Sequence, residues 1–297
     1  MKKPEARGRS EGWQHAKISG HKFESDFAAQ ILKDHDLFNS LSFVAKLDRI
    51  DRPISACITS EDKKPKSIFG DFTIAKTDVT VTTKTGRYLD LSIKKPSTNS
   101  GQIFLCRLAR FLDLIKIKTK KDIPKEVEWT LRSFFGETNG LKITEFAPKA
   151  QFLGPKIKKH KLLAEIYQNR LYASTIKLSY PDQWMSTQTF FKQNIDIITD
   201  CCFRSGMNDD IKEPRTTADY IYIGSIRRFV AVEALIDKSS GWNIFPGDKG
   251  YYKGSTIKMP WGFLQVHRPG EDHGPYQVQF HWNVKDMIRI LDSVTTG

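Results

Sequence analysis

Alternating polar and apolar positions predict a β-hairpin in the first third of the chain. Residues 77–83 and 87–95 are two extended runs rich in β-branched and apolar side chains, and the turn sequence Lys-Thr-Gly separates them. Because strand side chains alternate with period two, Asp90, Ser92 and Lys94 share one face of the second strand. Asp78 stands near the start of the first strand. The hairpin therefore brings a carboxylate opposite a lysine.

Apolar residues at helical spacing predict a helix on each side of this hairpin. Residues 21–34 carry one apolar face, and Glu24 lies beside that face near the start of the helix. Residues 102–115 show the same spacing, and Gln102 opens this second helix. The most regular part of the chain is therefore predicted to run helix, strand, strand, helix.

The last part of the chain returns to a strand pattern. Residues 260–268 and 276–283 alternate between apolar and polar side chains and predict a two-stranded ribbon, which a helix at 284–294 would cover. Amide side chains can bond adenine in a bidentate way and histidine can donate to guanine or phosphate, so the polar face could read base edges. The alternative is the solvated side of a sheet that carries neutral polar groups. The candidate DNA contacts of the ribbon are Gln265, His267, Arg268, Gln277, Gln279, His281 and Asn283.

Net charge narrows the class of partner. The 297 residues include 47 Lys and Arg against 34 Asp and Glu, which gives a net charge of +13 and a pI near 9.4. This balance favours a polyanion. Nucleic acid is preferred over an anionic membrane, because the chain lacks a long apolar run and a strongly amphipathic basic helix. Two basic runs, 116–125 and 155–161, are either solvated surface or phosphate contacts. The candidate phosphate-binding lysines are Lys156, Lys158 and Lys159.

The spacing of the cysteines indicates the cellular compartment, and the spacing of the histidines argues against a zinc site. The four cysteines show no CxxC spacing, which favours a reduced intracellular chain. The basic N-terminus is not followed by an apolar stretch, so we expect no secretory signal and a cytoplasmic location. The histidines do not follow a zinc-binding spacing.

Together these patterns predict an α/β fold with a mixed central β-sheet flanked by helices and a β-rich C-terminal part. We expect a flexible basic arm at residues 1–20 and a catalytic core at 21–150. Residues 151–297 would complete the sheet and recognise DNA, and they could form one continuous domain with the core.

The hairpin residues fit metal-assisted hydrolysis of a phosphodiester. Mg²⁺ takes hard oxygen ligands and keeps several waters, so one or two carboxylates are enough to hold it. Asp78 is the natural first ligand, and Lys94 would neutralise charge beside the scissile phosphate. Glu24 could bind the metal through water, and Gln102 could hold the phosphate or order a water. Mn²⁺ is expected to substitute for Mg²⁺, and we expect no organic cofactor.

At these residues the chain resembles the PD-(D/E)XK nuclease superfamily and, within it, type II restriction endonucleases. The family pattern is an acid on one strand, then an acid, any residue and a lysine on the next strand. Asp78 matches the first acid, Ser92-Ile93-Lys94 matches the second element, and Glu24 matches a helix glutamate that often contributes. The resemblance covers about the first third of the chain.

Ser92 departs from the pattern, because it stands where the family has its second acid. Glu24 could supply the missing carboxylate from its helix, and this is the alternative that we favour. Asp90 could supply it from two residues upstream, a step of about 6.6 Å along the strand. The third alternative is weak ligation through the Ser92 hydroxyl.

The resemblance implies a Mg²⁺-dependent, sequence-specific double-strand DNA endonuclease that acts as a homodimer on a palindromic site. Two other functions stay open at this point. One is a non-catalytic DNA-binding protein that uses the basic surface and the Gln/His ribbon. The other is a repair or recombination nuclease that recognises DNA structure rather than sequence.

Overall fold

The computed structural model describes residues 21–59, 64–95, 99–137, 170–209, 215–247, 254–266 and 277–293. The chain forms two compact units, each built from segments that are distant in sequence. Unit 1 comprises Met1–Thr98 and Phe203–Glu233, and unit 2 comprises Asn99–Cys202 and Ala234–Gly297. Each of the predicted segments 21–150 and 151–297 therefore contributes to both units, and residues 1–20 lie outside the described residues.

Unit 1 contains a mixed five-stranded sheet in the order β1-β2-β3-β5-β6. All neighbouring strands are antiparallel except β3 and β5, which are parallel. The predicted hairpin is its centre: β2 and β3 are joined at Gly86, whose φ of 82° suits a glycine in the turn. The strands are β1 (Pro53–Ile58), β2 (Val79–Thr83), β3 (Tyr88–Lys94), β5 (Tyr220–Ile223) and β6 (Arg228–Ala231).

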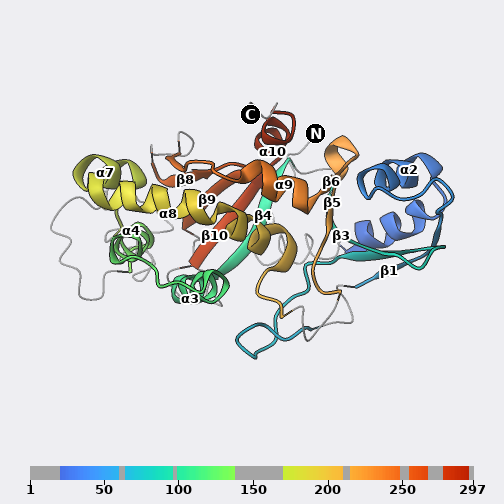
Figure 1. Ribbon diagram of the computed structural model, residues 1–297, viewed down its shortest axis with the longest axis horizontal. Helices are drawn as coiled ribbons and strands as arrows, with labels where there is room; N and C mark the ends of the chain where they lie inside the picture. Colours follow the sequence, from blue (N-terminus) through green and yellow to red (C-terminus); the bar gives the residue numbers. More distant parts are fainter. Residues whose placement is uncertain are drawn as a thin grey trace, which may run out of the picture. The chain divides into compact units, whose positions relative to one another are not determined.

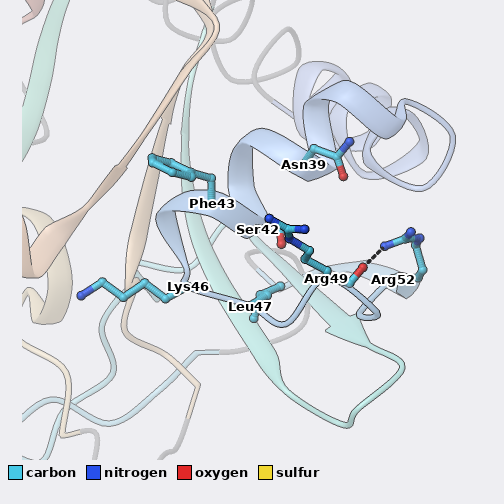
Figure 2. Close-up of a pocket in the computed structure, with 7 residues that line it drawn as sticks. All are labelled: Asn39, Ser42, Phe43, Lys46, Leu47, Arg49 and Arg52. Atoms are coloured by element: carbon cyan, nitrogen blue, oxygen red, sulfur yellow. Dashed lines mark hydrogen bonds between the residues drawn. The ribbon is translucent and has the colours of Figure 1, made fainter.

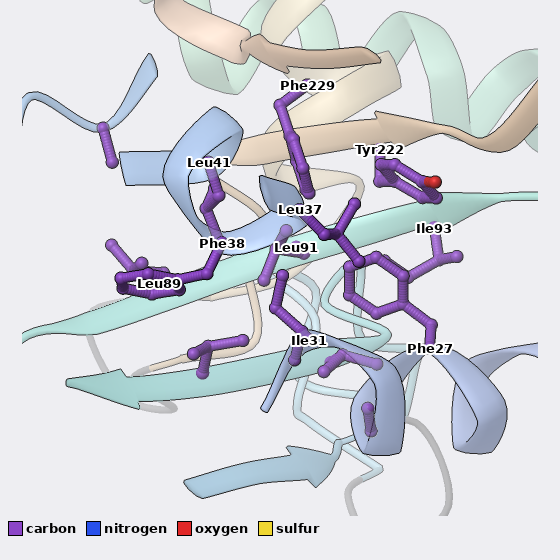
Figure 3. Packing of buried hydrophobic residues seen from close by; sticks show 14 residues of the cluster. Phe27, Ile31, Leu37, Phe38, Leu41, Leu89, Leu91, Ile93, Tyr222 and Phe229 are labelled. Carbon is purple, nitrogen blue, oxygen red and sulfur yellow. The ribbon is translucent and has the colours of Figure 1, made fainter. Parts of the chain in front are cut away.

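The helices of unit 1 pack on one face of this sheet. A helix at residues 21–31 is followed by α2 (His35–Val44), which begins where the Asp34 side chain accepts a hydrogen bond from the Leu37 amide. Figure 3 shows side chains from both helices meeting those of β3, β5 and β6. The buried apolar cluster includes Phe27, Ile31, Leu37, Phe38, Leu41, Val79, Val81, Leu89, Leu91, Ile93, Tyr222 and Phe229.

Alternation along the hairpin decides which side chains enter this core. Leu89, Leu91 and Ile93 point into the cluster, so Asp90, Ser92 and Lys94 lie on the opposite face of β3. The predicted shared face of these three polar residues follows from the same alternation.

Unit 2 contains a second five-stranded sheet in the order β4-β10-β9-β8-β7, with all neighbouring strands antiparallel. The predicted ribbon forms its β9–β10 pair, and the predicted final helix follows as α10 (Val284–Leu291). The strands are β4 (Ser100–Arg107), β7 (Phe245–Pro246), β8 (Thr256–Met259), β9 (Gly262–Val266) and β10 (Gln277–Asn283).

Helices α3 and α8 help to close the apolar core of unit 2. The Phe111 ring of α3 lies 5.5 Å from that of Phe280 on β10, and Trp261 Nε1 donates to Thr199 Oγ1 of α8 at 2.9 Å. Figure 1 shows the helices that accompany this sheet. Besides α10, the described helices of the unit include α3 (Leu108–Thr119), α4 (Lys125–Phe135), α7 (Ala173–Ser179) and α8 (Pro181–Asp200). A π-helical turn, η2 (Cys201–Ser205), and α9 (Val232–Ser239) lie where the chain passes from one unit to the other.

The predicted mixed α/β class is confirmed, with two sheets accompanied by helices. One predicted element is wrong in its first half. Residues 102–107 belong to strand β4, and the helix begins only at Leu108. Phe104 and Cys106 alternate into the core because β4 pairs with β10, and only from Leu108 onward does the helical period hold.

Candidate active site

The carboxylate of Asp78 closes the open end of the β2–β3 hairpin. Its backbone amide donates to the Leu91 carbonyl at 2.8 Å, which continues the strand pairing by one residue before β2 begins. Its Oδ2 atom accepts hydrogen bonds from the Ile93 amide at 2.6 Å and from the Ser92 hydroxyl at 3.1 Å. The Asp78 carboxylate thus accepts a hydrogen bond from the Ile93 amide, which lies beyond the last residue pair of β2 and β3.

Lys94 extends this arrangement along the same face of β3. Its ammonium donates to Ser92 Oγ at 2.8 Å. A continuous hydrogen-bonded path therefore runs from the ammonium through the hydroxyl to the Asp78 carboxylate. The structure brings together Asp78, Ser92 and Lys94, and Ser92 occupies the position between the two charged groups.

Burial raises the pKa of Asp78 above its usual value. The nearby Lys94 ammonium opposes this shift most strongly, followed by the hydrogen bonds from Ile93 and Ser92 and by the charge of Lys76. A desolvated carboxylate of this kind gains most from a cation close to it.

The Asp78 carboxylate fits Mg²⁺ as a single protein ligand. Both of its hydrogen bonds go to Oδ2, and within the described ranges no group donates to Oδ1. One free carboxylate oxygen is compatible with Mg²⁺, which retains several waters and completes its shell with substrate phosphate. The described part of the chain contains no group of three or more His, Cys, Asp or Glu side chains that could hold a metal ion.

Lys76 is a second cation near Asp78 that the sequence analysis did not single out. A Cβ atom at Gly206 would lie 2.9 Å from Lys76 Cε, so the lysine side chain passes directly over this glycine. The only sequence signal was its position, two residues before Asp78 in an extended run.

Asp90 lies two residues before Ser92 on the same face of β3, and its side chain is held by a residue of the neighbouring strand β2. Thr80 Oγ1 donates to Asp90 Oδ1 at 2.5 Å, and the Thr80 hydroxyl also contacts that of Thr59 at 3.0 Å. Asp90 is buried. These contacts give Asp90 a place in the packing between β1, β2 and β3.

Glu24 belongs to the helix at residues 21–31, whose Phe27 and Ile31 pack on the apolar face of the sheet. Its Oε2 lies 3.4 Å from His21 Nδ1. The side chains of Ser92 and Lys94 are on the other face of β3. The three predicted metal ligands Asp78, Glu24 and Asp90 thus do not form one cluster in the structure.

Gln102 is not at a helix start, which corrects the expectation from sequence. It lies on β4 in unit 2, where its Oε1 accepts a hydrogen bond from Gln279 Nε2 at 2.7 Å. Gln279 Oε1 in turn accepts from Gln265 Nε2 at 2.7 Å, and this nitrogen contacts His281 Nε2 at 2.9 Å. Four predicted polar residues are therefore joined across β4, β10 and β9.

The other predicted DNA contacts divide into two groups. Asn283 Oδ1 accepts from the amides of Lys285 and Asp286 at 2.9 and 3.3 Å and so caps α10, while Gln277 is buried beside β4. The rest lie outside the described residues: His267, Arg268, Lys156, Lys158 and Lys159.

Unit 1 also carries a basic surface pocket that the sequence analysis missed. It has a volume of about 510 Å³ and lies at the C-terminal end of α2 (Figure 2). Phe43 is 86% exposed, and the Arg52 guanidinium donates to the Arg49 carbonyl at 2.9 Å. The lining residues are Asn39, Ser42, Phe43, Lys46, Leu47, Arg49 and Arg52.

No protein-family model matches the chain, and no curated protein sequence matches it. Among solved structures, the chain is similar to the restriction endonuclease MspI in complex with its cognate DNA. The two are 12% identical, the TM-score is 0.44, and the match covers 83% of this chain and 77% of that one. A similarity of this degree does not establish a family for the chain. Among the described helices, none has the length and apolarity needed to cross a bilayer.

Proposed function

We propose that this chain is a Mg²⁺-dependent, site-specific double-strand DNA endonuclease of the restriction type. The observation that carries the proposal is the hydrogen-bonded path from Lys94 through Ser92 to Asp78 at the open end of a hairpin. A carboxylate and an ammonium held together at the half-buried end of the hairpin are groups that metal-assisted phosphodiester hydrolysis can use.

Each residue has a distinct role in this proposal. Asp78 would hold the metal, and Mg²⁺ bound there would supply an activated water and polarise the phosphate. Lys94 places positive charge beside the scissile phosphate as negative charge develops there. Ser92 positions Lys94 relative to Asp78 by bonding both. Glu24 and Asp90 are the candidates for a second, water-mediated carboxylate.

The net charge of +13 supports DNA as the partner, since phosphate neutralisation contributes most of the non-specific affinity for duplex DNA. We further propose a cytoplasmic homodimer, in which two copies cut the two strands of a palindromic site. Mn²⁺ should replace Mg²⁺, because both accept oxygen ligands.

Supercoiled plasmid incubated with Mg²⁺ or with EDTA tests the proposal. We expect discrete metal-dependent fragments from the native chain and no fragments from Asp78→Ala or Lys94→Ala, with gel-shift binding of DNA largely kept by both variants. Lys84→Ala is the matched control, because Lys84 is an exposed lysine in the turn of the same hairpin. Cutting at the native rate by either site variant would refute the assignment.

A non-catalytic DNA-binding protein is the second candidate. It is favoured by the hydrogen bonds of Asp78, which also serve to close the strand pairing. Its expected result is a gel shift with no cutting under any metal. Cutting confined to branched or damaged DNA would instead indicate a structure-specific nuclease. Within the endonuclease proposal, comparing Glu24→Ala with Asp90→Ala identifies the acid that assists Asp78.

A further inference from the structure

The second sheet carries a row of amide side chains on its polar face, all within unit 2. Two hydrogen bonds of 2.7 Å join Gln265 on β9 to Gln279 on β10, and Gln279 to Gln102 on β4. Strand register explains the row, since Gln279 pairs with Gln265 on one side and His281 pairs with Gln102 on the other. Because paired residues share a face, these side chains lie together.

The row has a direction. The Gln265 amide nitrogen donates to the Gln279 oxygen, and the Gln279 nitrogen donates to the Gln102 oxygen. This direction corresponds to the His281 tautomer that carries its proton on Nδ1, in which Nε2 accepts the second hydrogen of the Gln265 nitrogen at 2.9 Å. Each amide orientation depends on the next one, because reversing a single amide would bring two donors or two acceptors together.

This direction determines which group is left at the end of the row. Gln279 is 6% exposed, and its amide is bonded at both the nitrogen and the oxygen. Gln102 is exposed and its oxygen is occupied, so its NH₂ group is held in place with hydrogens available. Within the described ranges, no group accepts from that nitrogen.

The charges around the row suit the edges of a DNA groove. The linked amides themselves are neutral, whereas Arg107 is exposed on β4. Lys258 lies across from Phe263 on β8, with its ammonium 3.7 Å from the Asp286 carboxylate. Cations at the border can contact phosphates, and neutral donors between them can contact base edges. A held donor would select a base that presents an acceptor in the groove.

We propose that Gln102 is a base-reading residue, whose NH₂ group is aimed by the Gln265–Gln279–Gln102 row at an acceptor on a DNA base edge. This inference rests on the proposed function for the existence of a recognition site. Under this inference Gln102 contacts a base and not the reacting phosphate or its water. Gln279 is a positioning residue that does not itself touch DNA.

The test compares base preferences of variants in a random pool of DNA duplexes, selected by binding in Ca²⁺ and then cut in Mg²⁺. Gln102→Glu keeps an oxygen to accept from Gln279 but replaces the outward donor by an acceptor. We expect discrimination at one base position to fall about tenfold or more, with the preference moving toward cytosine, which presents a donor. Gln279→Leu should relax the same position without moving it toward cytosine.

Gln193→Glu controls for the added negative charge, because Gln193 is exposed on α8 in the same unit. Its base preferences should equal those of the native chain. An unchanged preference in both Gln102→Glu and Gln102→Ala would overturn the inference, and loss of cutting with unchanged preference would return Gln102 to catalysis. If the native chain selects no sequence at all, the proposed function fails as well, whereas native selection with unaltered variants defeats only this inference.

Discussion

Replacing Ser92 by aspartate would restore the second carboxylate of the hairpin and bring it close to Asp78. Ser92 Oγ is 3.1 Å from Asp78 Oδ2 and 2.8 Å from the Lys94 ammonium. Two like charges about 4 Å apart repel by about 4 kcal/mol at an effective dielectric constant of about 20. Lys94 attracts the new carboxylate and offsets part of this repulsion. We therefore expect Ser92→Asp to lower the free energy of unfolding by about 2 kcal/mol without metal.

The assay is urea unfolding at neutral pH, first in EDTA and then in Mg²⁺. Ser92→Asn is the control, because it introduces a side chain of similar size without charge. If a second carboxylate completes a metal site, Mg²⁺ should return the lost stability, since a ligand present at about 100 times its dissociation constant adds about 2.7 kcal/mol. The variant should also bind Mg²⁺ more tightly than the native chain.

Acid provides an independent check on the cause. Both carboxyl groups must be ionised to repel, so the difference between Ser92→Asp and Ser92→Asn should shrink as the pH falls through the carboxyl range. Equal stability of the two variants in EDTA at neutral pH, together with no response to Mg²⁺, would refute the proposed proximity and desolvation of the pair.

Two further predictions concern single side chains. Burial raises the pKa of Asp78, so ionisation of this carboxyl costs stability at neutral pH but not below the pKa that Asp78 has in the unfolded chain. Asp78→Asn should therefore stabilise the metal-free chain near pH 7 and lose this advantage in acid, as unfolding curves at both pH values would show. The same variant should abolish cutting in a plasmid assay. Asn283→Ala removes the cap of α10 and should reduce the free energy of unfolding by about 1 kcal/mol. DNA sequence preference should not change in this variant, and a changed preference would assign Asn283 a role beyond capping.

The hairpin could be predicted from sequence because its determinants are local. β-Branched residues, a glycine turn and strict alternation all lie within residues 77–95, and the structure pairs β2 with β3 in antiparallel fashion across this turn. The contact between Asp78 and Ser92 follows directly from this register. Prediction of this part of the site therefore needed no knowledge of the rest of the chain.

The strand β4 could not be predicted in the same way. Apolar residues fill positions 103–106 and continue into α3, so the segment fits both a helix and a strand. Pairing with β10, which lies far along the sequence, decides in favour of the strand. The interpretation of Gln102 depends on this pairing, because on β4 the residue belongs to a row of hydrogen-bonded amides and not to the start of a helix.

The serine at position 92, where a second acid is expected, is consistent with the cations around Asp78. Lys76 and Lys94 both lower the pKa of this carboxyl, so two positive charges already act on the position that a metal would occupy. They disfavour a divalent cation when DNA is absent. A phosphate group would neutralise the lysines and also provide an oxygen ligand for Mg²⁺. Under the proposed function, metal binding and DNA binding should therefore be coupled, and the serine is tolerated because the substrate supplies the negative charge that the protein lacks.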